Sequence, residues 1–354
     1  MTDSVSPSDG SLRPASQPEV VLDLQHVSKE YVLRRTSWSR RPRLRAVRDV
    51  SLTLTRGETL GIVGESGCGK STLGRIALTL LAPTSGRVLI DGADPARLRG
   101  GARRKLRRSI QAVFQDPAGA LDPRLTIGQS ISEPLKAART GSARQRRDEV
   151  GALLEMVGLD PARAGVRPRE LSGGQRQRVV IARALAPRPD VVVADEPVSA
   201  LDVSVQAQVL NLFRDLQASR QMSCLFISHD LAVVGFVADR IAVMYLGEIV
   251  ELGPAAAVLA TPLHPYTQAL KAAALAPARS VPVPAAPGPG APGPGSDASG
   301  SAEGVEAGLT GLLLAEAGCP FRARCPLAQP VCVSEKPRLH QVTEGRWAAC
   351  HLIS

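Results

Sequence analysis

The stretch 64–72 reads Gly-Glu-Ser-Gly-Cys-Gly-Lys-Ser-Thr and is the part of the chain best suited to chemistry. It lies between a short apolar run, residues 58–63, and an apolar stretch of helical character, residues 73–81. A strand, a glycine-rich turn and a helix in this order are typical of a phosphate-binding loop, because backbone N–H groups turn toward an anion and the helix N-terminus adds partial positive charge. Lys70 is then expected to reach the β- and γ-phosphates of a nucleoside triphosphate, and the Ser71 hydroxyl to bind Mg²⁺. The candidate nucleotide contacts are Gly64, Glu65, Ser66, Gly67, Cys68, Gly69, Lys70, Ser71 and Thr72.

Two acidic residues follow a second apolar run. Asp195 and Glu196 come directly after residues 191–194, Val-Val-Val-Ala. Asp195 is expected to hold Mg²⁺ directly or through water, and Glu196 to accept a proton from the attacking water. Hydrolysis of a γ-phosphate mainly needs positioning and neutralisation of developing charge, so one metal-binding and one water-activating carboxylate are sufficient. This pair indicates the second half of a nucleotide site.

A third candidate is the start of a helix at Leu-Ser-Gly-Gly-Gln, residues 171–175. Ser172, Gly173 and Gly174 there predict a second anion-binding helix N-terminus. The alternative interpretation is an ordinary capped helix without a ligand. Two such helix ends with only one lysine-bearing loop are explained if two copies of the domain face each other, each closing the nucleotide of the other.

The elements that position these residues alternate between strands and helices. The apolar patterns predict strands near residues 19–31, 50–55, 58–63, 86–92, 109–114, 190–194 and 223–227, helices over 73–81, 150–158 and 175–185, and a further helix starting at Asp202, which is expected to cap it. The segment between about residues 126 and 186 is expected to be helical, and the arginine-rich stretch 34–48 to be an exposed loop. This order favours a parallel sheet with helices on both faces and a helical insertion.

The chain has 354 residues, a formal net charge of +10 and only 3% aromatic residues. No apolar run approaches the ~20 residues that a membrane-spanning helix needs, and residues 1–18 lack the apolar core of a signal peptide, so we expect a disordered leader on a cytoplasmic protein. The positive charge has three possible explanations: an anionic membrane, nucleic acid, or solvated loops. The basic residues lie in two groups, Arg34, Arg35, Arg40, Arg41, Arg43, Arg45 and Arg48, and Arg97, Arg99, Arg103, Arg104, Lys105, Arg107 and Arg108.

The end of the chain has a different composition. Residues 276–305 are rich in Pro, Gly and Ala and predict a linker, and residues 308–317 predict a short apolar helix. Cys319, Cys325, Cys332 and Cys350 follow, whereas Cys68 and Cys224 are expected to be free thiols. In a cytosolic chain, four clustered cysteines indicate a metal site more than disulfides. Their ligand type suits an iron–sulfur cluster or zinc, although the paired C-x-x-C spacing typical of zinc is absent, and unligated thiols remain the third alternative.

Several of these motifs together resemble the ATP-binding-cassette (ABC) ATPases over roughly residues 19–275. The order of the phosphate loop, Gln115, Leu-Ser-Gly-Gly-Gln, Asp-Glu-Pro, Asp202 and His229 is the order in that family. Residues 202–210, 243–247 and 264–270 are similar to the ATP-binding subunits of oligopeptide and dipeptide importers, and Pro-Val-Ser-Ala-Leu-Asp at 197–202 to their F-type (OppF or DppF) form. The resemblance implies an α/β fold: a P-loop NTPase cassette at 19–275 with an antiparallel β subdomain, an inserted helical subdomain at about 116–187, and a small cysteine-containing extension at 306–354.

The resemblance also implies a role for each matching residue. Gln115 would contact Mg²⁺ or the attacking water and sense the permease. Ser172, Gly173 and Gly174 would contact the γ-phosphate held by the partner subunit, and Asp202 would lie at that interface. Tyr31 would stack on adenine, with a core tyrosine as the alternative. The implied catalytic set is Lys70, Gln115, Glu196 and His229, and the implied Mg²⁺ ligands are Ser71, Gln115 and Asp195.

The resemblance implies partners as well. They are a paralogous D-type ATP-binding subunit, two membrane permease subunits and an extracytoplasmic substrate-binding protein, with the chain at the cytoplasmic face of the plasma membrane. Some members of the importer group hold a [4Fe–4S] cluster in the C-terminal segment. Two rivals remain: a cassette ATPase that acts on nucleic acid or ribosomes, whose usual second cassette or long coiled-coil insertion is absent here, and a non-catalytic regulatory subunit. Nucleic acid is therefore not an expected partner.

Overall fold

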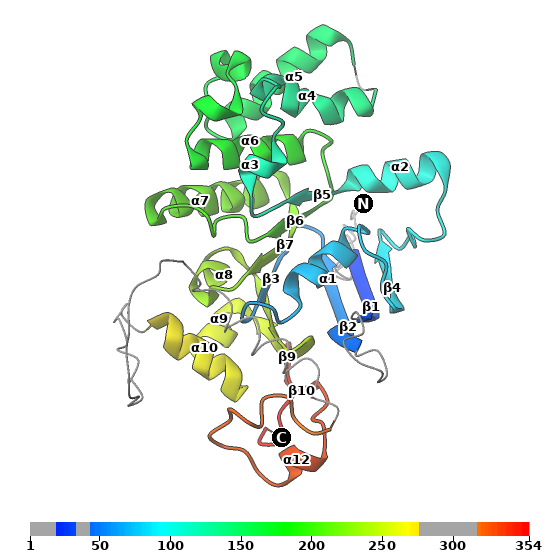
Figure 1. Ribbon diagram of the computed structural model, residues 1–354, viewed down its shortest axis with the longest axis vertical. Helices are drawn as coiled ribbons and strands as arrows, with labels where there is room; N and C mark the ends of the chain where they lie inside the picture. The colour runs from blue at the N-terminus through cyan, green and yellow to red at the C-terminus, as the bar shows by residue number, and fades with distance from the viewer. Residues whose placement is uncertain (1–18, 33–42, 140, 276–316, 354) are drawn as a thin grey trace, which may run out of the picture.

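A computed structural model describes residues 19–32, 43–139, 141–275 and 317–353 (Figure 1). The expected leader at 1–18, the linker at 276–305 and nearly all of the helix expected at 308–317 lie outside the described residues. Of the arginine-rich stretch expected to be a loop, residues 34–42 also lie outside them.

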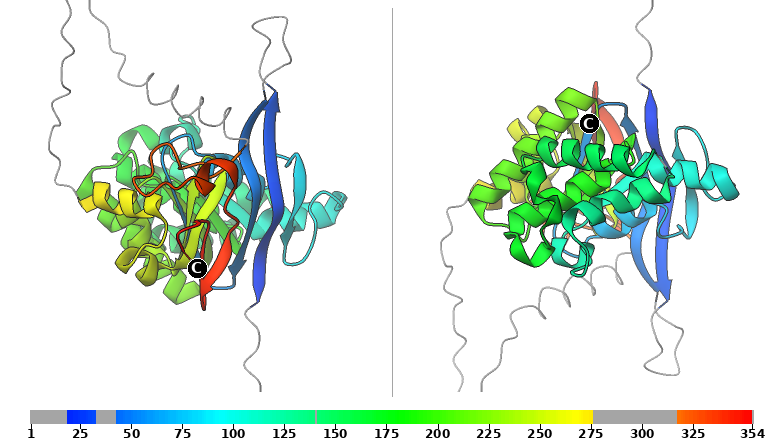
Figure 2. Two further views of the ribbon diagram at one scale, coloured as in Figure 1. Left: turned by 90° about the horizontal axis from the view of Figure 1, so that it is seen from below. Right: turned by 90° about the horizontal axis from the view of Figure 1, so that it is seen from above.

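Three antiparallel strands form a small sheet in the order β2-β1-β4. These are β1 (Val20–Val32), β2 (Arg43–Thr55) and β4 (Ser85–Ile90), and Figure 2 shows the blue β1 and β2 along one side of the molecule. The expectation of a loop up to residue 48 was wrong for Arg43 to Arg48. They belong to β2, because Arg43 and Arg45 lie across from β1 and form ion pairs with Glu30 at 3.1 and 3.0 Å.

An eight-stranded sheet in the order β10-β11-β9-β8-β3-β7-β6-β5 runs through the centre of the molecule. Its parallel strands are β3 (Thr59–Val63), β5 (Ile110–Val113), β6 (Val191–Asp195), β7 (Ser223–Ser228) and β8 (Arg240–Tyr245). The antiparallel strand β9 (Glu248–Pro254) follows β8, and a C-terminal hairpin, β10 (His340–Thr343) and β11 (Arg346–Ala348), pairs with β9. The C-terminal segment, residues 317–353, thus extends the same sheet that carries the phosphate loop.

Every described element between β5 and β6 is helical. The longer ones are α4 (Ile127–Ala137), α5 (Ala143–Met156) and α6 (Gly173–Leu185), with the short α3 (Pro117–Ala120) and two 3₁₀ turns, η1 (Pro161–Gly165) and η2 (Pro168–Glu170). They lie at the top of the view in Figure 1. The other helices are α1 (Lys70–Ala77), α2 (Gly100–Ser109), α7 (Val203–Arg220), α8 (Leu231–Val237), α9 (Ala255–Ala260), α10 (Pro265–Leu275) and α12 (Val331–Ser334).

Two helices differ from the sequence prediction. The helix after the phosphate loop ends at Ala77 rather than Leu81, because Thr79 has a left-handed backbone with φ 58° and Leu80 is exposed. The second basic group was weighed as solvated loops, yet most of it forms α2, whose arginines point to solvent while Leu106 packs against the core. Arginine and lysine favour helices, so a basic helix that is mostly exposed can form.

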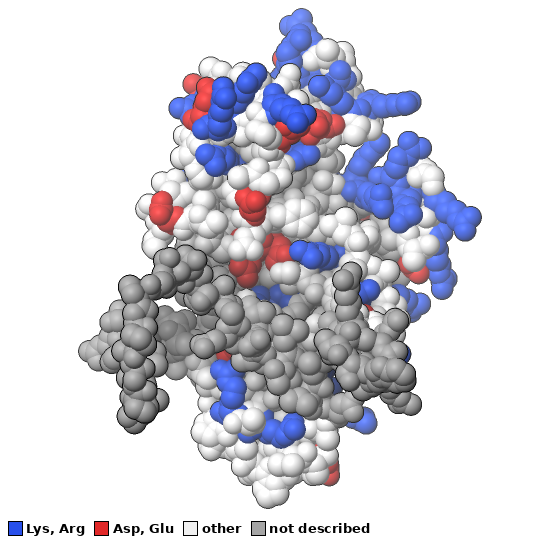
Figure 3. Space-filling view, viewed as in Figure 1, with Lys and Arg blue, Asp and Glu red and all other residues white. Residues whose placement is uncertain are grey.

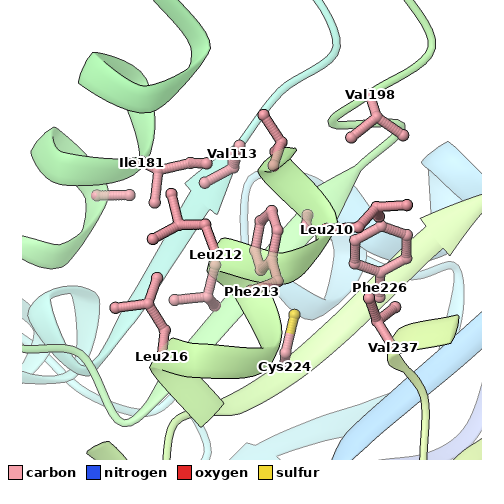
Figure 4. Close-up of a cluster of buried hydrophobic side chains, with 14 of the residues drawn as sticks. Val113, Ile181, Val198, Leu210, Leu212, Phe213, Leu216, Cys224, Phe226 and Val237 are labelled. Carbon is pink, nitrogen blue, oxygen red and sulfur yellow. The ribbon is translucent and has the colours of Figure 1, made fainter. Parts of the chain in front are cut away.

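The central sheet is buried on both faces. Alternate residues of β6 belong to different core clusters: Val192 and Ala194 to one, Val191 and Val193 to the other. Figure 4 shows the first cluster, in which Phe213 of α7 meets Phe226 of β7 edge-on at 5.5 Å between ring centroids. A parallel strand covered on both sides must be apolar throughout, which explains the uninterrupted valines that identified β6 in the sequence. None of the described helices is long and apolar enough to span a bilayer.

Candidate active site

The phosphate loop joins β3 to α1 as the sequence predicts. Gly69 precedes α1 with a φ of 107°, and a Cβ at this position would lie 2.0 Å from the Ala46 carbonyl oxygen, so only glycine fits there. Lys70 is buried, and its Nζ donates hydrogen bonds to the carbonyl oxygens of Gly64 at 2.7 Å and Glu65 at 2.8 Å. The lysine therefore lies along the inside of the loop, where a triphosphate would bind.

Ser71 and Asp195 meet beside the loop. The Ser71 hydroxyl donates to Asp195 Oδ1 at 3.0 Å. Burial raises the pKa of Asp195, while the hydrogen bond from Ser71 opposes that rise. A hydroxyl and a carboxylate oxygen are hard ligands of the kind that Mg²⁺ takes, and Mg²⁺ is usually held by one or two protein oxygens plus substrate phosphates. These two side chains fit the predicted metal position.

Glu196 and His229 face each other from the ends of β6 and β7. The Nδ1 atom of His229 lies 3.3 Å from Glu196 Oε2, and the Glu196 side chain is 17% exposed. Glu196 has a left-handed backbone with φ 48°, which is rare for a residue with a side chain and typical of functional sites. Its N–H donates to the Ile227 carbonyl, which fixes the turn across the two strands. The carboxylate is thus held beside Asp195 at the edge of the sheet.

Gln115 and Tyr31 make fewer interactions than the four residues just described. Gln115 lies just after β5 with an exposed side chain that makes no hydrogen bond to any described residue. Tyr31 is half-buried near the end of β1, and Lys29 Nζ lies 5.6 Å from its ring centroid. Within the described part of the chain, no hydrogen bond or ion pair joins either residue to the phosphate loop.

The helix end at Ser172 is capped and separate from the phosphate loop. Ser172 Oγ accepts the Gln175 N–H at 3.3 Å, and Gln175 Oε1 accepts the Ser172 N–H at 3.1 Å, a capping box. A Cβ on Gly174 would lie 2.2 Å from Val205 Cγ1, so this glycine lets α6 approach α7. Asp202 occupies the N-cap position of α7 as predicted, but its side chain accepts no capping hydrogen bond. In Figure 1 α6 lies toward the top of the molecule and α1 near the middle.

Two families match this chain in different parts. The family described as ABC transporter matches residues 47–199, which include the phosphate loop and Glu196. The family described as oligopeptide/dipeptide transporter, C-terminal region, matches residues 250–332. The probable peptide ABC transporter ATP-binding protein y4tS of Sinorhizobium fredii is 48% identical over 336 residues, covering 94% of this chain and 90% of the relative. The chain belongs to the ATP-binding subunits of peptide ABC transporters.

Other relatives agree with this assignment. The oligopeptide transport ATP-binding protein AppF of Bacillus subtilis is 44% identical over 346 residues, covering 96% of this chain and 99% of AppF. Among solved structures, the dimeric ATP-binding cassette MJ0796 bound to ADP and Pi has a TM-score of 0.58 and 33% identity, covering 66% of this chain and 98% of that chain. CbiO1 from Clostridium perfringens, part of the ABC transporter complex cbiONQ, has a TM-score of 0.59 and 28% identity, covering 69% and 92%. The predicted cassette fold is confirmed, and the chain is an ABC-type ATPase.

None of the four C-terminal cysteines of this ABC subunit forms a disulfide bond within the described residues, and neither do Cys68 and Cys224. Burial raises the pKa of Cys319 and Cys350, and charge on neighbouring cysteines adds to the rise in both. The Cys319 N–H donates to the Cys332 carbonyl oxygen at 2.8 Å, so these two residues lie side by side. However, no group of three or more His, Cys, Asp or Glu side chains in the described residues is arranged to hold a metal ion. As placed, the cysteines do not form a ligand set.

Two residues that contact the phosphate loop of this ABC subunit were not among the predicted site residues. The Tyr266 hydroxyl accepts the Glu65 N–H at 2.9 Å, and the guanidinium of Arg324 donates to both carboxylate oxygens of Glu65 at 2.8 and 2.7 Å. Tyr266 lies in the stretch 264–270 that resembled the importers, but nothing in its spacing indicated the loop as its partner. Arg324 is 259 residues from Glu65 in the chain, and no local pattern could have indicated the pair.

Proposed function

We propose that this chain is the ATP-hydrolysing subunit of a peptide importer and energises a membrane permease. The observation that carries the proposal is the meeting of Ser71 with Asp195 and of Glu196 with His229 beside a phosphate loop. The similarity to peptide-transport subunits along nearly the whole chain supports the cargo class. We keep the domain limits given above: a cassette at 19–275 with its helical insertion at about 116–187, and an extension at 306–354.

In this proposal each residue of the centre has one task. Lys70 exchanges its bonds to the loop carbonyls for the β- and γ-phosphates, and α1 directs its N-terminus at the same charge. Ser71 and Asp195 hold Mg²⁺, which would neutralise charge on the phosphates. Glu196 takes a proton from the attacking water, and His229, whose Nδ1 lies 3.3 Å from Glu196 Oε2, keeps the carboxylate oriented and would contact the γ-phosphate.

The proposal requires a second cassette. Ser172, Gly173 and Gly174 form a capped helix N-terminus, and no hydrogen bond in the described residues links them to the phosphate loop. An exposed helix end of this kind suits a γ-phosphate that belongs to a facing subunit. We propose that a D-type paralogue supplies this subunit and that Asp202 lies at the shared interface. Closure around two nucleotides would then drive two permease subunits, which receive peptide from an extracytoplasmic binding protein. The ATP-binding subunits would lie at the cytoplasmic face of the membrane, with Gln115 on the side that faces the permease.

The test is ATP hydrolysis by the assembled transporter, measured as phosphate release with and without peptide-loaded binding protein. We expect Lys70→Ala to abolish nucleotide binding and hydrolysis, and membrane subunits to co-purify with the chain. Hydrolysis that persists in the Lys70 variant would refute the site. Salt-sensitive binding of nucleic acid, without association with a permease, would favour the rival function, and the basic face over α2 in Figure 3 makes that control necessary.

For the C-terminal cysteines we propose an iron–sulfur cluster rather than zinc or free thiols. Four cysteines within one short segment suit such a cluster by ligand type, although a ligand set would require the segment to rearrange. Protein purified without oxygen would be brown, absorb near about 400 nm as thiolate-bound iron–sulfur clusters do, and contain iron and sulfide. Stoichiometric zinc, or neither metal, would refute the proposal.

A further inference from the structure

Glu65 is bound from three directions. Its backbone N–H donates to the Tyr266 hydroxyl at 2.9 Å, and its carbonyl accepts from Lys70 Nζ at 2.8 Å. Its carboxylate accepts both N–H groups of the Arg324 fork at 2.8 and 2.7 Å. The second residue of the phosphate loop is therefore shared between the phosphate-binding lysine and two residues outside the loop. A displacement of Glu65 would move an acceptor of Lys70.

Arg324 comes from the C-terminal segment, one residue before Cys325. Its guanidinium carbon lies 5.7 Å from the ring centroid of Phe321 and 6.0 Å from that of Tyr245, within range of cation–π attraction. Phe321 is buried and packs on Tyr245 and Tyr266 at centroid distances of 5.4 and 5.5 Å. The cluster of Phe321, Tyr245 and Tyr266 thus holds the C-terminal segment next to the loop and orients Arg324 toward Glu65.

Tyr266 is itself rigidly placed. It is fully buried, and its N–H donates to His264 Nδ1 at 3.0 Å. The Glu251 carboxylate of β9, also fully buried, accepts the N–H groups of Leu263 and His264, both at 2.9 Å. The same carboxylate lies 3.2 Å from Arg346 of the C-terminal hairpin. A second chain of contacts, from Tyr266 through His264 and Glu251 of β9 to Arg346, therefore also connects the loop to the C-terminal segment.

We propose that the C-terminal segment positions the phosphate loop, with Arg324 and Tyr266 as positioning residues that set the affinity for the triphosphate. The inference rests on the nucleotide site proposed above. A loop already fixed in its bound shape loses less conformational freedom when the phosphates bind. The contacts of Arg324 and Tyr266 with Glu65 therefore favour nucleotide binding more than the chemical step. Arg324 is partly exposed, with 53% of its side chain accessible, so the effect of the ion pair is moderate.

The experiment compares nucleotide affinity and the kinetic constants of full-length variants, with a fluorescent ATP analogue for binding and phosphate release of the assembled complex for KM and kcat. Arg324→Ala is expected to raise Kd and KM about three- to fivefold, the size of a partly exposed bidentate pair, with kcat within about twofold. Glu65→Ala is expected to act alike, and the double variant to add nothing further. Arg324→Lys keeps the charge without the fork and should recover part of the affinity.

Lys336→Ala is the matched control, because Lys336 joins the same segment to Glu248 of β9 at 2.8 Å and has no hydrogen bond or ion pair with the described loop residues. An unchanged Kd for Arg324→Ala, or an equal loss in Lys336→Ala, would overturn the proposal. If Arg324→Ala does not fold, Tyr266→Phe, which removes the acceptor of the Glu65 N–H, provides the same comparison. Lys70→Ala is measured in parallel. Normal nucleotide binding by that variant would refute the nucleotide site itself. Loss of binding in Lys70→Ala together with an unchanged Kd for Arg324→Ala would refute only the positioning role of Arg324.

Discussion

Gly174 offers the sharpest structural test of the helix end that is proposed to serve the facing subunit. It is the second residue of α6, and a Cβ there would lie 2.2 Å from Val205 Cγ1 of α7, where ordinary contacts begin at 3.4 Å. Gly174→Ala must therefore push the helix end and α7 apart by about 1 Å, because protein interiors leave no room for overlap. The three heavy atoms nearest to this Cβ all belong to the Val205 side chain, at 2.2, 3.6 and 3.8 Å, so the conflict is local.

The magnitude follows from two opposing terms. Overpacking costs about 1–3 kcal/mol, whereas alanine is favoured over glycine in a helix by about 1 kcal/mol. The free energy of unfolding should fall by about 0–2 kcal/mol, which leaves the subunit folded. A displacement of about 1 Å at a group that contacts reacting phosphates can nevertheless lower turnover by about 10²-fold. We expect normal ATP binding at the Lys70 site and a large loss of kcat in the assembled complex.

Two variants control this prediction. Gly173→Ala would place its Cβ 3.5 Å from Leu201 Cδ2, an ordinary contact, and should change the fold little. Val205→Ala removes the conflicting methyl group, so the Gly174→Ala, Val205→Ala double variant should regain most of the lost kcat. Thermal unfolding and phosphate release are measured on all variants. Full activity of Gly174→Ala, or no recovery in the double variant, would show that the close approach of α6 and α7 does not position Ser172.

Three further predictions follow from single residues. Glu196→Gln keeps the shape of the side chain but cannot take a proton, so kcat should fall by about 10²–10⁴-fold while the complex still retains ATP, as measured by phosphate release and nucleotide binding. Burial lowers the pKa of His264 to about 4 from 6.5, so the unfolded chain gains a proton first and stability falls as pH drops from 6.5 toward 4, by up to about 3 kcal/mol. Denaturant unfolding should show this slope, and His264→Asn, which keeps an acceptor for the Tyr266 N–H, should flatten it. Burial raises the pKa of Cys224 to about 12, so iodoacetamide at pH 8 should label this thiol only after unfolding, as mass spectrometry would show.

The candidate nucleotide site could be predicted from the sequence because its signals are local. The phosphate loop, the apolar strand before Asp195 and the strand before His229 each lie within a few residues of the group they position. Parallel strands place their carboxyl ends at one edge, so Lys70, Asp195 and His229 were expected at the same edge of the sheet once the strands were recognised. The start of β2 was mispredicted because the residue that pairs with its arginines lies on another strand. Its arginines alternate across from Glu30 of β1, and a charge that is satisfied by a neighbouring strand looks like a solvated loop when the partner is unknown.

The support beneath the loop could not be predicted, and the physics of the Arg324–Glu65 pair explains why. Charge pairing has no fixed sequence spacing outside a helix or a strand pair, and both residues occur in stretches whose local pattern already has another explanation. The pair exists only because β11 adds to the edge of the sheet at β9 and Phe321 fills the space against Tyr245 and Tyr266. Sheet extension and aromatic packing bring the last part of the chain to the first residues of the loop. A segment that looks like an appendage in the sequence is therefore joined, in the fold, to the loop that is proposed to bind the phosphates.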